Sequence, residues 1–495
     1  MFFFQPSSPD LSPERYATTT LPLEITDLII DELCTGSREQ YLQALIPCCT
    51  AARAFVDPCQ KHIFRSVTLS SPAQNKPWSR REVVERIEKL FIKTLHFVDI
   101  INRRPHLRSN VQELTYAVDS ELYEHELDLL PEVGEAICQL TKLTSLTLRA
   151  HGPRPVPFAP SEELIICILS MLKHLPIKSF TLSAVKDFHL NLLTAPTALE
   201  ELTLANSTLD WESAMRQRRH SIMPSVEPGE LWLKKLTCNA KSLEEGLNVY
   251  LSYAKSEHVG ARGAFSHLEQ LKVDISPVPP HYTEDPFRHI SKSMERLREL
   301  DLTFDCGNTR DWFHKPSPLE DLHPSSFESL THLTFNAMVS LPMDDYWIND
   351  SDPGENTFLD EPYMGLCKPP FTSLHELRYL HINLVIQGDL SLVNQQSFGP
   401  QWGQLPDALS TPGTFRRLSE VTLAINVRAP VKMTGITTEA TLARRAEAVR
   451  RSILSHVYPA QFESLIALDR EGVLRFGFEV RATVGPVIGT AVVGN

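Results

Sequence analysis

The chain has 495 residues, 42% of them hydrophobic, and a formal net charge of −13. This length allows about two to four domains. The acidic balance argues against broad binding to nucleic acid or to an anionic membrane surface, because both favour a basic face. Nine cysteines without regular spacing do not form a disulfide pattern, which favours a reducing compartment. No apolar run approaches the ~20 residues that cross a bilayer, and the N-terminus does not resemble a signal peptide. We therefore expect a protein of the cytoplasm or nucleus, with no membrane or nucleic-acid partner.

Residues 1–19 are rich in Pro, Ser and Thr and are predicted to be a flexible leader. The next stretch, residues 21–69, predicts two short helices and a strand-like exit. Pro22 stands where a helix can begin, and apolar residues then recur at helical spacing, namely Ile25, Leu28, Ile29 and Leu33. A second apolar pattern consists of Leu42, Leu45, Ile46 and Phe55, within which Pro47 predicts a bend or a new start.

This segment resembles an F-box. The residues that match the usual Leu-Pro-x-Glu-Leu/Ile pattern and its continuation are Leu21, Pro22, Glu24, Ile25, Ile29 and Leu33. The exit, residues 62–69, is similar to that of many F-box proteins of mushroom-forming fungi. Ala51, Ala52 and Phe55 stand where Val, Cys and Trp are commoner in the family. The alternative is a small helical cap that packs on its own chain.

A linker at residues 71–79 is predicted to precede a helix that begins near Arg80 and leads into Thr94–Phe97. An apolar-x-x-apolar-x-apolar pattern then occurs ten times. Its copies begin at Val111, Leu143, Ile177, Leu199, Leu233, Leu268, Leu297, Leu330, Leu377 and Leu418. Each copy predicts a strand, and stacked copies predict a curved α/β solenoid with a parallel sheet on its concave face.

The pattern resembles the leucine-rich repeats that follow many F-boxes. The spacing ranges from 22 residues (177 to 199) to 47 residues (330 to 377), and the Asn that normally follows the strand is missing. Ser207, Ser276, Asp305 and Met338 stand there instead. We therefore expect an irregular solenoid in which each turn satisfies its backbone groups in its own way.

Helices are predicted between the strands, at residues 161–175 and after Asp285. The longest excursion, residues 336–370, is acidic and contains aromatic residues. It is either a solvated loop or a contact patch for a basic partner. Residues 437–457 predict a helix that caps the solenoid, and residues 473–480 predict a final strand. The expected organisation is a leader (1–19), an F-box-like segment (20–70), a solenoid (71–430) and a C-terminal cap (431–495).

No catalytic motif is present, and the 18 histidines lack partners at metal-ligand spacing. We expect no catalytic residue, no metal and no cofactor. The basic run at residues 215–220 is interpreted as a solvated helix face. Residues between the inward leucines would form the concave face, and the predicted substrate contacts are Arg149, Thr203, Lys272, Asp301 and His381.

The resemblance implies a substrate receptor of a cullin–RING ubiquitin ligase. Its N-terminal helices would dock on a Skp-type adaptor, and its solenoid would bind a protein substrate of unknown identity. The predicted adaptor contacts are Leu21, Pro22, Ile25, Leu28, Ile29, Leu33, Leu42, Leu45 and Phe55. A scaffold that uses its repeats alone is the alternative, and an enzyme is a third hypothesis. An adaptor site should leave the helix face at residues 21–33 exposed, whereas a cap should bury it.

Overall fold

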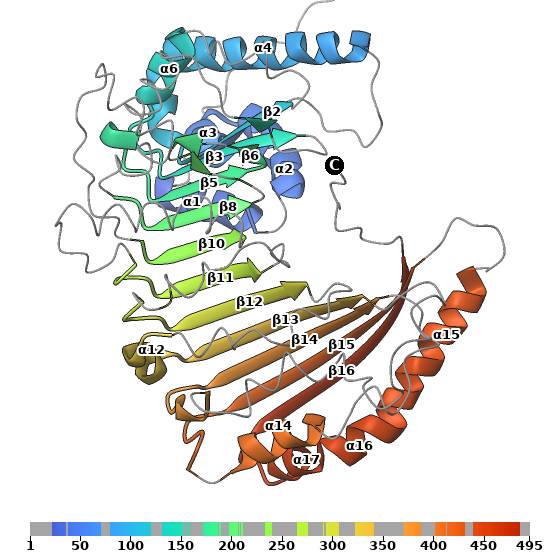
Figure 1. Cartoon of the computed structure of the whole chain (residues 1–495). Coiled ribbons are helices and arrows are strands. Elements are labelled where there is room, and N and C mark those ends of the chain that lie inside the picture. Colours follow the sequence, from blue (N-terminus) through green and yellow to red (C-terminus); the bar gives the residue numbers. More distant parts are fainter. Residues whose placement is uncertain are drawn as a thin grey trace, which may run out of the picture.

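The protein is an α/β structure built on a 12-stranded parallel sheet (Figure 1). The structure is a computed structural model. It describes residues 22–35, 38–70, 80–119, 131–151, 156–157, 172–186, 188–189, 198–205, 207, 209–210, 233–239, 265–275, 291, 294–305, 322–340, 371–387, 401–411, 413–430 and 439–485. In these parts of the chain, no helix is long and apolar enough to span a membrane.

Three helices and a short 3-10 turn form the N-terminal module. They are α1 (Leu23–Leu33), α2 (Arg38–Ala51), η1 (Arg53–Phe55) and α3 (Val56–Arg65). No new helix starts at Pro47, because α2 continues through Pro47 to Ala51. The break comes at Ala52, whose backbone is extended. α3 was not predicted, and the strand-like exit begins at Ser66 rather than at His62.

The helix predicted near Arg80 is α4 (Arg80–Arg103), followed by the 3-10 turn η2 (Pro105–Asn110). The helix was predicted to lead into Thr94–Phe97, but these residues lie inside α4. Thr94 and Phe97 are buried there. The helical period therefore continues about two turns beyond the predicted end.

Every copy of the repeat pattern forms a strand of the sheet, and the strands follow one another in chain order. β1 precedes the ten copies and β16 follows them. The strands are β1 (Ser66–Ser70), β2 (Glu113–Asp119), β3 (Ser145–His151), β5 (Ser179–Ser183), β8 (Glu201–Ala205), β10 (Lys235–Asn239), β11 (Gln270–Ile275), β12 (Glu299–Asp305), β13 (His332–Ser340), β14 (Tyr379–Gln387), β15 (Glu420–Pro430) and β16 (Arg475–Gly485).

The register places one apolar residue of each repeat beside its equivalents in the neighbouring repeats. This core row is Leu114, Leu146, Phe180, Leu202, Leu236, Leu271, Leu300, Leu333, Leu380, Val421 and Phe476. All of these except Phe476 are buried. Each strand alone would expose its apolar side, so the stacked rows supply the core.

The strands lengthen toward the C-terminal end of the sheet. β13 reaches Ser340, so the excursion predicted from Asn336 begins later than expected, because Ala337 and Val339 continue the buried alternation. The rest of that excursion, residues 341–370, lies outside the described residues. β16 was predicted at residues 473–480 but extends to Gly485.

The remaining described elements are short. Two two-stranded sheets pair β4 (Val156–Pro157) with β6 (Val185–Lys186) and β7 (Phe188–His189) with β9 (Leu209–Asp210). Short helices are α6 (Pro131–Cys138), α12 (Pro324–Ser329), η9 (Phe371–Ser373) and α14 (Gln401–Ser410). The helices predicted at residues 161–175 and after Asp285 fall almost entirely outside the described residues, as does the basic run at 215–220.

The predicted C-terminal helix is α15 (Glu439–Ser452), which continues through a π-helical turn (Ile453–Val457) into α16 (Tyr458–Gln461) and α17 (Glu463–Arg470). On one face of this helical segment Ala446, Val449, Ile453 and Val457 are buried and Leu442 is half-buried. α15 contacts β15 and β16, and the helical segment runs alongside β16, the last strand of the sheet (Figure 1).

Candidate docking surfaces

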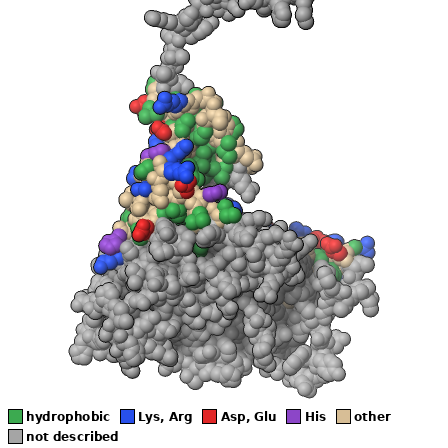
Figure 2. All heavy atoms as spheres, turned by 90° about the horizontal axis from the view of Figure 1, so that it is seen from above, with side chains coloured by type: hydrophobic (Ala, Val, Ile, Leu, Met, Phe, Trp, Pro, Cys, Tyr) green, Lys and Arg blue, Asp and Glu red, His purple; other side chains and the backbone are tan. Residues whose placement is uncertain are grey.

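The first candidate surface is the outward face of α1. Only Thr26 and Ile30 of this helix are buried. Leu28 is 64% exposed, and Ile25, Ile29 and Leu33 each expose about two fifths of their surface. α1 thus turns most of its large apolar side chains to solvent. Figure 2 views the molecule from above and shows hydrophobic side chains among charged ones on the surface of the described residues.

A small core of its own holds α1 in place. Ile30 packs with Leu45 of α2 and Cys59 of α3, all three fully buried. The helix begins after Pro22, whose carbonyl oxygen accepts from the N–H of Ile25 at 3.0 Å. This core is separate from the core of the sheet.

Polar contacts between side chains also join α3 to α1. His62 Nε2 lies 2.8 Å from Asp31 Oδ1, and Lys61 Nζ lies 3.6 Å from Asp27 Oδ1. Because α3 runs directly into β1, the module is continuous with the sheet. His106 Nε2 of η2 lies 3.3 Å from Gln60 Oε1 of α3 and adds a second connection.

The eight predicted adaptor contacts that the structure describes fall into three groups. Pro22 and the four apolar residues of α1 are exposed, and Leu42 and Phe55 are partly buried. Leu45 is fully buried, so it supports the surface from beneath. Leu21 lies outside the described residues. Sequence reasoning missed Ile46, which is strongly exposed on α2 although it belongs to the same apolar pattern.

The second candidate surface is the face of the sheet opposite the core. One row across it begins with six threonines in register, namely Thr68, Thr115, Thr147, Thr181, Thr203 and Thr237. The row continues as Lys272, Asp301, Thr334, His381 and Thr422. Four of the five predicted substrate contacts thus share one row, and Arg149 lies two residues beyond its row member Thr147 on β3.

A chain of amides starts from this row. Lys272 Nζ lies 2.8 Å from Asp301 Oδ2, while Asp301 Oδ1 accepts from Asn336 Nδ2 at 2.7 Å. Asn336 Oδ1 then accepts from Asn383 Nδ2 at 3.3 Å, and Asn383 Oδ1 accepts from Asn426 Nδ2 at 2.9 Å. We call Asp301, Asn336, Asn383 and Asn426 the amide ladder. All four side chains are partly exposed, so the ladder retains access to solvent.

The amide ladder includes a residue that sequence reasoning did not single out. Asn336 and Asn383 occupy the same position of their repeats, but Asn426 lies two residues further along its strand, opposite Val385. Where β13 and β14 begin, His332 stacks on Tyr379 with ring centroids 4.5 Å apart. The sequence could have predicted this stacking, because His332 and Tyr379 occupy the same position of two neighbouring repeats.

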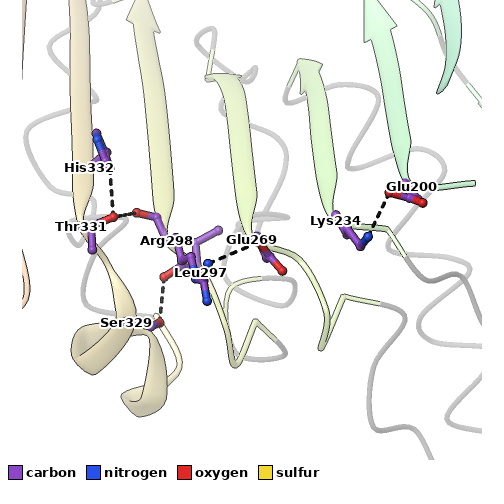
Figure 3. A network of polar contacts seen from close by, with 8 residues as sticks. All are labelled: Glu200, Lys234, Glu269, Leu297, Arg298, Ser329, Thr331 and His332. Carbon is purple, nitrogen blue, oxygen red and sulfur yellow. Dashed lines mark hydrogen bonds and ion pairs between the residues drawn. The ribbon is translucent and has the colours of Figure 1, made fainter. Parts of the chain in front are cut away.

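A different network lies at the end of the sheet where the strands begin, which we call the entry edge (Figure 3). Lys234 Nζ lies 2.9 Å from Glu200 Oε2, and Arg298 Nη1 lies 3.8 Å from Glu269 Oε2. The hydrogen bond from Lys234 lowers the pKa of the Glu200 carboxyl, and the same bond raises the pKa of Lys234. Alternating charges in neighbouring repeats thus brace this edge.

The backbone of the entry edge is regular. In nine successive repeats, one carbonyl oxygen accepts from two consecutive N–H groups of the next repeat. Gln112, for example, accepts from Thr144 and Ser145 at 2.8 and 3.0 Å. The turns that follow the strands do not share one hydrogen-bond pattern. After β8, for example, Ser207 Oγ accepts from the N–H of Val185 at 3.1 Å. Asp305 and Met338, predicted to lie in such turns, are instead strand residues.

Among the described residues, no three His, Cys, Asp or Glu side chains are placed to hold a metal ion. The chain was compared with protein-family models and with curated proteins, and neither comparison gave a match. The two surfaces above are therefore the basis for assigning a function.

Proposed function

We propose that this protein is a substrate receptor of a cullin–RING ubiquitin ligase, in which the N-terminal module docks on a Skp-type adaptor and the sheet carries the substrate. The receptor itself has no catalytic role in this proposal, because the ligase chemistry belongs to its partners. Such a complex would act in the cytoplasm or nucleus.

The observation that carries the proposal is the exposed apolar face of α1. Ile25, Leu28, Ile29 and Leu33 are turned to solvent, whereas Ile30 of the same helix packs in the core of the module. Burying one large aliphatic side chain stabilises a complex by roughly 1.5–3 kcal/mol. A contiguous apolar face with a packed core beneath it is typical of an interaction surface.

A helical cap is the competing interpretation, and it makes the opposite prediction for α1. A cap would bury its apolar face on the first repeats. Instead, α3 and not α1 joins the module to the sheet. α3 leads into β1, the first strand of the sheet, and α3 also contacts η2. The exposure of α1 therefore favours docking over capping, while a repeat-only scaffold stays the alternative.

The face of the sheet opposite the core supplies a surface for the second partner. It presents partly exposed hydroxyls, amides and a Lys272–Asp301 ion pair rather than apolar side chains. Polar groups of this kind provide specificity in a protein interface more than affinity. We therefore assign substrate binding to the row that contains Lys272, Asp301 and His381.

Co-elution with a Skp-type adaptor in size-exclusion chromatography tests the docking step. The wild-type chain is expected to co-elute, and Leu28→Glu is expected to abolish co-elution because it places a charge in the apolar contact. Val473→Glu is the matched control, since Val473 is also 64% exposed but precedes β16. Absence of co-elution for the wild type, or co-elution of Leu28→Glu, would contradict the proposal.

A further inference from the structure

Four of the described cysteines converge in the N-terminal module. Cys34 follows α1, Cys48 and Cys49 lie on α2, and Cys59 lies on α3. Cys59 is a member of the small core with Ile30 and Leu45, and the other three cysteines pack against that core. All four are free thiols. Three helices thus bring their sulfur atoms into one place.

One pair within this cluster links α2 to α3. Cys49 packs against the small core that contains Cys59, and a side-chain hydrogen bond with Cys49 is one cause of the raised pKa of the Cys59 thiol. Cys59 is fully buried, whereas Cys49 is half-buried. Buried cysteines often serve as small hydrophobic residues, but a contact between two sulfur atoms also allows them to bond.

We propose that Cys49 and Cys59 are a modification site, a thiol pair that a hydroperoxide oxidises to a reversible disulfide between α2 and α3. The half-buried thiol of Cys49 meets the oxidant, and the buried thiol of Cys59 completes the bond. Disulfides of reducing compartments are typically transient and redox-sensing, which fits a pair that is reduced in the resting protein.

The chemistry balances in two steps. The sulfur of Cys49 attacks one oxygen of hydrogen peroxide, the O–O bond breaks, one water leaves, and Cys49 becomes a sulfenic acid. The sulfur of Cys59 then attacks the sulfur of Cys49, the S–O bond breaks, and the leaving oxygen takes the Cys59 proton as a second water. Two thiols are oxidised by two electrons, and the peroxide is reduced.

The environment of Cys59 keeps this thiol from reacting with the oxidant directly. Burial, with the neighbouring Cys49, Cys48 and Cys34, raises the pKa of the Cys59 thiol to about 12. Cys59 is therefore protonated at neutral pH and does not react with external oxidants as a thiolate. Its hydrogen-bond contact with Cys49 keeps it beside the sulfur that it must attack.

The disulfide would alter the support of α1. A disulfide holds two sulfur atoms about 2.05 Å apart, closer than two thiols in contact, so α2 and α3 would be drawn together beneath Ile30. We expect the oxidised module to bind an adaptor several-fold more weakly. This consequence rests on the proposed function, whereas formation of the disulfide does not.

Peptide mapping of the full-length protein tests the bond. Folded protein is treated with hydrogen peroxide, alkylated and digested with trypsin, which releases residues 39–53 with Cys48 and Cys49 and residues 54–61 with Cys59. We expect these two peptides to be linked in the wild type and in Cys48→Ser. The link should be absent in Cys49→Ser and Cys59→Ser, and dithiothreitol should reverse it.

Three results would overturn the proposal. They are no link between the two peptides in folded wild-type protein, a link that persists in Cys49→Ser, or a link that forms only after denaturation in urea. Cys49→Ser changes a half-buried residue, so its outcome can be interpreted even if Cys59→Ser fails to fold.

An adaptor co-elution assay on reduced and oxidised protein separates this inference from the proposed function. Oxidation should weaken co-elution of the wild type several-fold and leave Cys49→Ser unchanged. If neither form of the wild type binds but the peptides still become linked, the proposed function fails and the disulfide stands. If the peptides do not link, the disulfide fails whatever the adaptor does.

Discussion

Asn336 donates a hydrogen bond from Nδ2 to Oδ1 of Asp301, 2.7 Å away. An ionised carboxylate accepts hydrogen bonds and cannot donate them, so this bond fixes which end of the Asn336 amide faces β12. The Oδ1 atom of Asn336 must then face β14, where it accepts from Asn383, and Asn383 in turn accepts from Asn426. One carboxylate therefore orients three amides across four strands.

The first prediction follows from that direction. In Asn383→Asp, the new carboxylate can accept from Asn426 but cannot donate to Asn336. We expect a loss of about 1–3 kcal/mol in the free energy of unfolding at neutral pH, larger than the loss in Asn383→Ala. Urea unfolding of both variants measures the difference.

The pH dependence provides the control for this prediction. A carboxyl that faces the oxygen of Asn336 has its pKa raised above the usual ~3.9. Its destabilising effect should therefore be present at neutral pH and should weaken as the pH falls through the raised pKa. Equal stability of the Asp and Ala variants at every pH would contradict the direction of the amide ladder.

A second prediction separates the two faces of the N-terminal module. Leu45 is fully buried, whereas Leu28 is 64% exposed. Leu45→Ala should lower the stability of the module by about 2–5 kcal/mol through lost packing, and Leu28→Ala should change it by less than about 0.5 kcal/mol. Hydrogen exchange of the α2 and α3 amides measures both effects. Comparable losses in the two variants would mean that α1 packs differently in solution.

The repeat pattern made the sheet predictable. Leu143, Leu146 and Leu148, for example, define both the strand and its inward side, because the pattern alternates with the period of a strand. All ten copies became strands in chain order. Strand ends were less predictable, since β13 continues as long as buried residues alternate and β16 continues past Val480 through the partly buried Ala482 and Val484. A short motif does not specify where such an alternation stops.

The helical module was harder to predict. Pro47 lacks a backbone N–H, but α2 continues through it because a helix can lose one hydrogen bond when its other turns stay packed. The row of Thr203, Lys272, Asp301 and His381 followed from repeat positions alone. The link to Asn426 did not, because its side chain reaches diagonally to Asn383 from a position that the repeat pattern does not mark.

A third prediction concerns acid sensitivity at the entry edge. The hydrogen bond from Lys234 lowers the pKa of Glu200 in the folded protein. A lowered carboxyl pKa contributes stability that is fully present above the unfolded pKa, about 4.3, and is lost as the pH falls through the folded pKa. Glu200→Gln should therefore be less stable than the wild type at neutral pH, and the difference should vanish in acid.

Salt provides the control for Glu200→Gln. Both partners are well exposed, so about 1 M salt should screen most of the contribution. Urea unfolding of the wild type and the variant, at several pH values and two salt concentrations, measures it. A difference that persists in acid and in high salt would indicate packing rather than charge.

The fourth prediction concerns the free edge of the sheet. Arg475 donates its N–H to the carbonyl of Ser419, so alternate residues of β16 face β15 and those between face the open edge. Two of these edge groups are occupied. The carbonyl of Val480 accepts from Arg450 Nε at 2.9 Å, and the N–H of Phe476 donates to Asp469 Oδ1 at 3.0 Å.

Arg450→Ala should therefore uncover the edge. We expect it to lower the free energy of unfolding by about 1.5–3 kcal/mol, as loss of a charge-assisted hydrogen bond does, and to increase self-association because an open strand edge pairs readily. Arg451→Ala is the matched control. Arg451 pairs with the same Glu447 as Arg450 but is well exposed, so its removal should cost less than about 1 kcal/mol. Urea unfolding and light scattering measure the two effects. If Arg451→Ala self-associates as strongly as Arg450→Ala, the contact with Val480 does not protect the edge.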